Sequence, residues 1–288
     1  MHFLTAMDRR RALAYLAGLA LMACSDRKTT PPDPLKVYSA TIFHKPAPTP
    51  NHLYIVGQVH RNPVPQSELE RLASPKVAQK IQDRDKQRIS AQTQIYRIGE
   101  YLNSVKGISL LLVEGRMENR DYFATSQQEK QASMEALPQV RSMAANDTSL
   151  RDFFDKRPKA RASGVLEFTT DMYQQGYEDE KLYRALGDLW KSPTRANDPI
   201  RVRGRQISSA VALVNASLVI QREFERKRIS SKSAMLVIGK DHLDEMIAYM
   251  KAGKASIPRV PELGTKETVV DLGLDEYNVT VLLPRGIK

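Results

Sequence analysis

The sequence contains three residues of metal-ligand type, each placed directly after an apolar segment. His60 and His242 each end a Gly-x-x-His motif, and Glu114 directly follows a third apolar run. Two imidazoles and one carboxylate can form a facial site for a divalent metal ion that leaves positions open for water or substrate. Such a site suits hydrolysis, because the metal ion lowers the pKa of bound water and polarises the scissile carbonyl.

The three apolar segments must bring these residues together for such a site to exist. Residues 53–56, 108–113 and 234–238 are apolar at nearly every position, which is typical of strands buried on both faces of a parallel sheet. Parallel strands end at one edge of the sheet, where open α/β folds bind their ligands. We expect Gly57 and Gly239 to let the chain turn sharply off its strand, so that each histidine points back over this edge.

The pattern along the rest of the chain predicts an α/β fold with a central, mostly parallel sheet, flanking helices and a helical insertion or cap. Helical spacing between the first two apolar segments indicates a strand–helix–strand unit. Gly107 marks the end of its helix. The expected parts are an α/β domain over 51–288, a polar helical insertion over about 117–200, helices over 201–227 and 243–251, and further strands over 36–43, 267–271 and 278–283.

Each candidate ligand also has a structural interpretation. His60 can hydrogen-bond within its loop, His242 can cap the helix that follows it, and Glu114 can pair with Arg116 or Arg120. Glu114 can also act as a general base instead of a ligand. The chain lacks a Gly-x-Ser-x-Gly nucleophile elbow, so a Ser–His–Asp hydrolase is not indicated.

The N-terminus has the pattern of a bacterial lipoprotein signal peptide over residues 1–23. Three arginines precede an apolar run, residues 12–23, that is too short to span a bilayer. The run ends in Leu-Met-Ala before Cys24, the only cysteine, which predicts acylation (palmitate-type chains) of Cys24 and stable membrane anchoring. Residues 24–50 are then the lipidated cysteine and a proline-rich tether. Ser25 favours the periplasmic face of the outer membrane over the inner membrane.

Charge and composition restrict the partners of an exported protein of this kind. The formal net charge is +11, but basic residues are mostly interleaved with acidic ones, as on solvated helix faces. No basic–aromatic motif indicates nucleic-acid binding. We therefore expect a membrane partner through the lipid on Cys24, and a peptide or small-molecule substrate.

Together, Gly57-Gln58-Val59-His60, Val113-Glu114-Gly115-Arg116 and Gly239-Lys240-Asp241-His242 resemble the motifs of the TraB/GumN/Tiki superfamily. This superfamily also includes erythromycin-esterase-like and ChaN-like proteins. For Tiki-like members the resemblance implies metal-dependent peptide hydrolysis, with the two histidines and the glutamate at the metal. For ChaN-like members it implies an outer-membrane lipoprotein that binds haem, although Val59 stands where haem binders have an acidic residue.

The resemblance also implies an arginine on the long helix before the last motif. Arg205 is the best match, and Arg201 and Arg203 are alternatives. Three functions follow as hypotheses. The first is an envelope hydrolase, a peptidase or esterase, that uses Mn, Co or Zn, with Arg116 and Arg205 holding a substrate carboxylate or oxyanion. The second is a haem- or iron-binding lipoprotein with a histidine as axial ligand, and the third is a non-catalytic envelope protein with a degenerate site.

Overall fold

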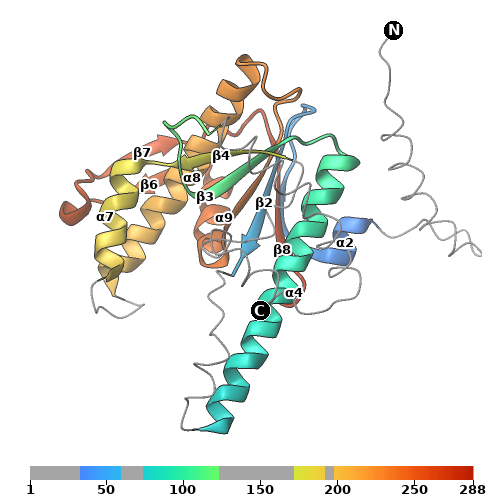
Figure 1. Cartoon of the computed structure of the whole chain (residues 1–288). Helices are drawn as coiled ribbons and strands as arrows, with labels where there is room; N and C mark the ends of the chain where they lie inside the picture. Colours follow the sequence, from blue (N-terminus) through green and yellow to red (C-terminus); the bar gives the residue numbers. More distant parts are fainter. Residues whose placement is uncertain (1–32, 60–73, 123–171, 192–197, 288) are drawn as a thin grey trace, which may run out of the picture. The chain divides into compact units, whose positions relative to one another are not determined.

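A six-stranded, mostly parallel sheet organises the chain, as shown in the computed structural model in Figure 1. The strand order is β1-β8-β2-β5-β3-β4, and the last five strands in this order are parallel to one another, whereas β1 is antiparallel to β8 at the edge. The strands are β1 (Ser39–Lys45), β2 (His52–Gln58), β3 (Leu110–Met117), β4 (Tyr173–Glu178), β5 (Ala234–Gly239) and β8 (Asn278–Pro284). The predicted α/β fold class is confirmed.

The structure describes residues 33–59, 74–122, 172–191 and 198–287. The predicted signal peptide, Cys24 and His60 therefore lie outside the described residues. No helix within the described ranges has the length and apolar character needed to cross a membrane.

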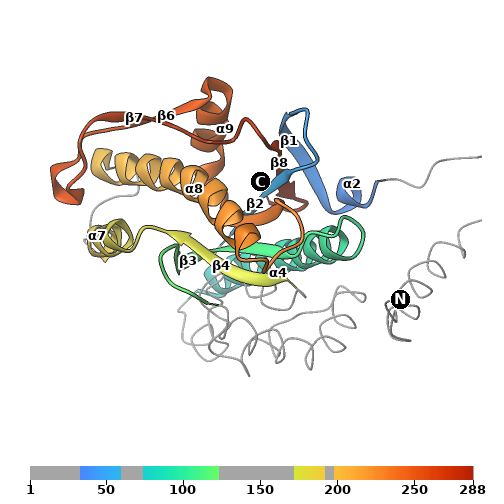
Figure 2. The same ribbon diagram turned by 90° about the horizontal axis from the view of Figure 1, so that it is seen from above.

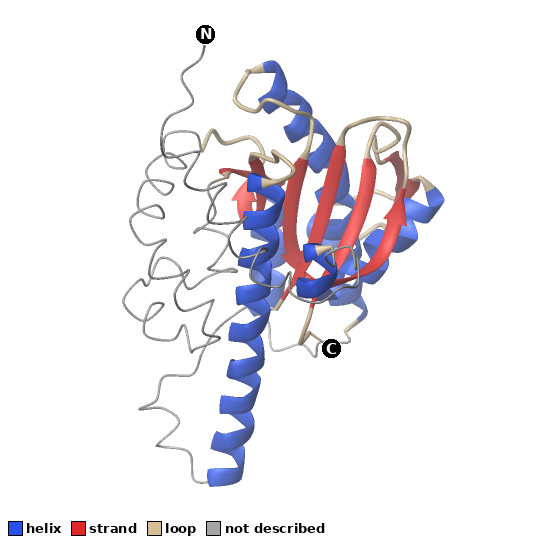
Figure 3. Ribbon diagram, turned by 90° about the vertical axis from the view of Figure 1, so that its right-hand side faces the viewer, coloured by secondary structure: helices blue, strands red, loops and turns tan. Residues whose placement is uncertain are grey.

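Helices cover both faces of the sheet. Their bounds are α2 (Pro34–Tyr38), α4 (Pro75–Ser104), α7 (Glu180–Lys191), α8 (Pro199–Glu225) and α9 (Leu243–Ala252), with short 3₁₀ helices η3 (Lys240–His242) and η4 (Pro261–Leu263). Helices α8 and α9 pack on one face, and α2 and α4 pack on the other (Figures 2 and 3). A separate antiparallel pair, β6 (Lys254–Ile257) and β7 (Thr268–Asp271), follows α9.

The central strands are apolar on both faces because both faces are covered. In β2, Ile55 packs towards α8 and α9, and Val56 packs towards α4; both side chains are fully buried. In β5, Leu236 likewise packs towards α8 and α9, and Val237 packs towards α4. Full burial of such a side chain stabilises the fold by roughly 1.5–3 kcal/mol, so polar groups are excluded from these strands until they reach their ends.

The expected strand–helix–strand unit is present as β2, α4 and β3. Helix α4 starts with Pro75 after Ser74, and Gly107 with φ +67° follows its end. Its two strands are not neighbours, because β5 lies between β2 and β3 and pairs with both. This insertion brings β5, the strand before His242, next to β3, the strand that carries Glu114.

The region 117–200, expected to be helical, contributes a strand to the central sheet. Its β4 forms the edge beside β3, and α7 follows it directly. The strand was missed because its sequence, Tyr-Gln-Gln-Gly-Tyr-Glu, lacks an apolar pattern. Long-range hydrogen bonds replace that pattern: buried Gln175 donates from Nε2 to the carbonyl oxygen of Arg120, 2.7 Å away. The predicted cap over 123–171 lies outside the described residues.

A bulge in β3 shapes the end of that strand. Val113 stands opposite Gly176 and Met117 opposite Glu178, so the three residues 114–116 face only one residue of β4. Gly115 supports this bend with φ +84°, a conformation that glycine adopts readily. The bulge presses the backbone of β3 onto Gly176, where an added Cβ would lie 2.3 Å from the carbonyl carbon of Arg116. Bulges of this kind re-aim side chains and are common beside functional sites.

This contact predicts that Gly176→Ala destabilises the protein by roughly 2–4 kcal/mol, because backbone atoms cannot move aside as a flexible side chain can. The matched control is Gly187→Ala in α7, where an added Cβ meets nothing within 4 Å and helix propensity improves by up to about 1 kcal/mol. Urea denaturation of both variants measures the difference. Equal stability of the Gly176→Ala variant and the wild type would contradict the bulge.

Candidate functional site

Four neighbouring strands end at the same edge of the sheet and carry polar groups there. Gln58 is the last residue of β2 and stands opposite Gly239, the last residue of β5. Glu114 lies in the bulge of β3, and Glu178 is the last residue of β4. His242 follows β5 after the single turn of η3. This carboxyl edge is where the sequence predicted a site.

Glu114 is held across two neighbouring strands. Its Oε2 accepts a hydrogen bond of 2.9 Å from the backbone N–H of Gly239 in β5 and one of 3.2 Å from Nε2 of Gln58 in β2. Gln58 belongs to the first Gly-x-x-His motif, and Gly239 belongs to the last. These two hydrogen bonds fix the position of the Glu114 carboxyl group.

The same contact leaves a buried acceptor beside Glu114. The side chain of Gln58 is 1% exposed, and because its Nε2 faces Glu114, its Oε1 points elsewhere and has no hydrogen-bond partner among the described residues. Gln92 of α4 shows the same arrangement: its Nε2 donates to the carbonyl oxygen of Val59, and its buried Oε1 has no hydrogen-bond partner in the part of the chain that the structure describes. Buried unpaired acceptors call for a cation, a water molecule or a ligand donor.

His242 is buried and held by α8. It is 5% exposed, and its Nδ1 lies 2.9 Å from Oγ of Ser209. The helix α9 starts directly after it, as expected, but the side chain of His242 makes no capping hydrogen bond. His242 thus occupies the N-cap position of α9, as the structural interpretation expected, but its side chain does not cap the helix.

Glu178 is a carboxyl group at this edge that sequence reasoning missed. It is 5% exposed, and burial, followed by the negative charge of Glu114, raises the pKa of Glu178 to about 8, although a hydrogen bond from the backbone of Gly115 opposes this rise. Glu178 thus keeps its proton at neutral pH beside the Glu114 carboxylate. Two carboxyl groups with separated protonation states are the usual basis of acid–base chemistry. The sequence analysis did not single out Glu178, because the strand that it ends, β4, was not predicted.

The predicted substrate-binding arginines have intramolecular contacts. The guanidinium of Arg116 lies over the ring of Tyr122, with 5.1 Å between Cζ and the ring centroid. Arg205 donates from Nε and Nη2 to Oε1 of Glu245 in α9, both at 2.7 Å. The substrate role of both arginines stays a prediction. Arg120, the other proposed partner of Glu114, forms its ion pair with Glu180.

The two motif glycines do not serve the role expected of them. Gly57 lies inside β2, where an added Cβ would come within 2.7 Å of Cδ1 of Leu243. Gly239 has φ −50° and ψ 134°, which other residues also adopt. The chain does turn from β5 into η3 after Gly239, but this turn does not need a glycine. Gly57 instead makes room for the first residue of α9, which packs against β2.

The described residues do not complete a metal site by themselves. No group of three or more His, Cys, Asp or Glu residues that could hold a metal ion occurs within the described ranges. Glu114 and His242 are present at the ends of adjacent strands, and the third expected ligand, His60, lies outside the described residues. Glu114 and His242 supply a carboxylate oxygen and an imidazole nitrogen, which are donor types that divalent cations accept.

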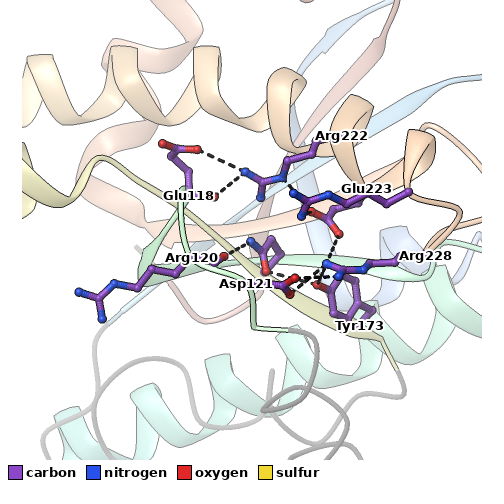
Figure 4. A network of polar contacts seen from close by, with 9 residues as sticks. Glu118, Arg120, Asp121, Tyr173, Arg222, Glu223 and Arg228 are labelled. Atoms are coloured by element: carbon purple, nitrogen blue, oxygen red, sulfur yellow. Dashed lines mark hydrogen bonds and ion pairs between the residues drawn. The ribbon is translucent and has the colours of Figure 1, made fainter.

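A second polar cluster belongs to the framework. Glu223 of α8 is fully buried and pairs with Arg222, Arg226 and Arg228, and Arg228 also binds Asp121 at 2.7 Å (Figure 4). These contacts join the C-terminal end of α8 to the segment after β3. A cavity of about 770 Å³ opens beside this cluster, away from the predicted site residues; its lining is Ser109, Gln221, Phe224, Glu225, Lys227, Arg228, Ile229, Ser230 and Lys232.

Comparison with known proteins gives no matching family model, no matching curated protein and no matching solved structure. The resemblance to the TraB/GumN/Tiki superfamily therefore rests on the three motifs.

The raised pKa of Glu178 predicts a pH-dependent loss of stability. In the unfolded state this carboxyl group has its ordinary pKa of 4.5, whereas in the folded state burial raises its pKa to about 8. Between these values the folded state binds more protons, so the free energy of unfolding falls as pH rises, at about 1.4 kcal/mol per pKa unit. Glu178→Gln should remove this pH dependence. Between pH 5 and pH 9, its free energy of unfolding should therefore fall by several kcal/mol less than that of the wild type.

Denaturation of both proteins at pH 5, 7 and 9 measures this difference. Glu267→Gln, which removes a carboxyl group from an exposed position before β7, should follow the wild-type pH profile. A Glu178→Gln variant with the wild-type profile would show that Glu178 ionises normally in the folded protein.

Proposed function

We propose that the chain is an envelope-anchored hydrolase, a peptidase or esterase, with its active centre at the carboxyl edge of the sheet. One observation carries this proposal. Glu114, Glu178 and His242 come from three neighbouring strands that are otherwise buried, and all three lie where these strands end. Placing two carboxyl groups and an imidazole there costs desolvation free energy. A purely structural role for this edge of the sheet would not require these ionisable groups.

Each residue has a distinct role in this proposal. Glu114 and His242, with His60, would hold a divalent ion such as Mn, Co or Zn, which when bound would activate water and polarise the scissile carbonyl. Gln58 and the backbone of Gly239 keep Glu114 in place. Glu178 holds a proton that it can deliver to a leaving group as a general acid.

The membrane anchor is a proposal of its own, carried by the sequence before Cys24. An acylated cysteine would keep the enzyme at the envelope, where its substrates would be peptides or small esters. The tether expected over residues 24–50 was too long, because the α/β fold begins at Pro34 with α2 and β1. Residues 24–33 would then separate the lipid from the α/β domain.

A non-catalytic envelope protein is the second candidate, and two observations favour it. Oε2 of Glu114 already accepts two hydrogen bonds from the framework, and Arg205 is paired with Glu245. In this alternative, Glu114 ties the strand ends together and binds no metal. Metal content separates the two candidates without knowledge of the substrate.

Elemental analysis of the purified protein after reconstitution should find about one divalent ion per chain. His60→Ala, Glu114→Gln and His242→Ala should each lose it, because each removes a donor that the site needs. The matched control is His44→Ala, which removes an exposed histidine of β1 that contacts Thr280 and should retain the ion.

Metal-free wild type, or unchanged metal content in the His242→Ala variant, would support the non-catalytic candidate. Haem in place of the ion would appear as a Soret band on titration that is lost in the histidine variants, and would overturn the hydrolase proposal in favour of a haem-binding lipoprotein.

A further inference from the structure

Ser209 lies beneath His242 in the middle of α8 and contacts two groups at once. Its Oγ lies 2.9 Å from Nδ1 of His242 and 2.9 Å from the backbone carbonyl oxygen of Arg205, one turn earlier in the helix. Ser209 is fully buried and His242 is 5% exposed, so water does not compete freely for either group.

Counting protons decides the direction of both hydrogen bonds. A carbonyl oxygen cannot donate, so only the hydroxyl proton of Ser209 can bridge the two oxygens of its contact with Arg205. A serine hydroxyl has one proton, so the contact with His242 must use a proton on the imidazole. With the hydroxyl proton on the Arg205 contact, the ring donates from Nδ1, and the Nδ1–H tautomer has its lone pair on Nε2.

We propose that Ser209 is the positioning residue of the site, which holds His242 as the Nδ1–H tautomer and so presents Nε2 as its ligating or proton-accepting nitrogen. The use of Nε2 rests on the proposed function, whereas the tautomer itself does not. Ligating histidines commonly donate their other ring N–H to an oxygen acceptor, which fixes the ring orientation. Because the Ser209 hydroxyl donates its only proton to the carbonyl oxygen of Arg205, its oxygen can act as such an acceptor.

The surrounding contacts keep α8 and α9 in the register that this hydrogen bond needs. Arg205, one turn before Ser209, pairs with Glu245, about one turn after His242. Tyr249, a further turn along α9, donates from its hydroxyl to the carbonyl oxygen of Gln206 at 3.4 Å. His242 and two successive turns of α9 thus make polar contacts with α8, so His242 has little freedom to rotate away from Ser209.

A structural role for Ser209 would look different. Serines inside helices often bond to the carbonyl oxygen four residues earlier for local reasons alone, and that bond does not need a histidine. If this were its whole role, replacing Ser209 would change stability slightly and leave the His242 ring unchanged. The tautomer of His242 is therefore the measurement that separates the two roles.

The test is ¹H–¹⁵N correlation spectroscopy of the histidine side chains in the full chain in detergent micelles, with His242→Ala to assign the signals. Wild type should show His242 with its proton on Nδ1. Ser209→Ala should shift the ring towards the Nε2–H tautomer, and Ser209→Thr should restore the wild-type pattern because it retains the hydroxyl. Ser208→Ala, which changes the neighbouring buried serine, should have the wild-type spectrum.

Metal binding provides the second measurement. Loss of the Nδ1 partner should weaken the affinity for Mn²⁺ or Zn²⁺ by about 10–100-fold in the Ser209→Ala variant, with recovery in Ser209→Thr. An Nε2–H ring in wild type, or an unchanged tautomer in Ser209→Ala, would overturn the role of Ser209. The expected tautomers without metal binding by any variant would overturn the proposed function and leave the Ser209 contact established.

Discussion

The carboxyl edge of this protein depends on where the Glu114 carboxyl group is held. Its hydrogen bonds to the backbone of Gly239 and the side chain of Gln58 span from β3 across β5 to β2, and the bulge at residues 114–116 allows the side chain to reach them. The same bulge presses on Gly176 of β4 and brings Glu178 into the electrostatic field of Glu114. One carboxylate thus connects the geometry and the protonation of the whole edge.

Burial explains why the polar groups gather there. The middle residues of β2, β3 and β5 have apolar layers on both faces, and an unpaired polar group in those layers would cost several kcal/mol. Strand ends are the first positions where charged groups find backbone donors and partners from other strands. At the opposite end of α8, the buried charge of Glu223 is tolerated for a related reason, because three arginines surround it (Figure 4).

Helix α8 links the site to the rest of the fold. Its buried face packs on the sheet, its Ser209 and Arg205 contact His242 and Glu245, and its last turns carry the arginine cluster. The position of His242 therefore depends on the packing of a long helix, and not only on the short loop after β5. Placing a site residue against a rigid helix reduces the conformational entropy that it would lose on binding a ligand.

The sequence by itself determined the α/β fold class, the three central strands, the start of α9, and the placement of Glu114 and the motif of His242 after strands, because these depend on local apolar patterns. Only the tertiary structure decided which strands pair and which side chains contact one another. Strand β4 and Glu178 escaped detection because the sequence of β4 lacks a regular apolar pattern, and the strand is defined by its pairing with β3 and by the hydrogen bond of Gln175 to the carbonyl oxygen of Arg120. The position of β5 between β2 and β3, the Ser209–His242 contact and the Arg205–Glu245 ion pair join residues 33 or more positions apart. No local pattern encodes such pairings, because they arise only when α8, α9 and the sheet have packed together.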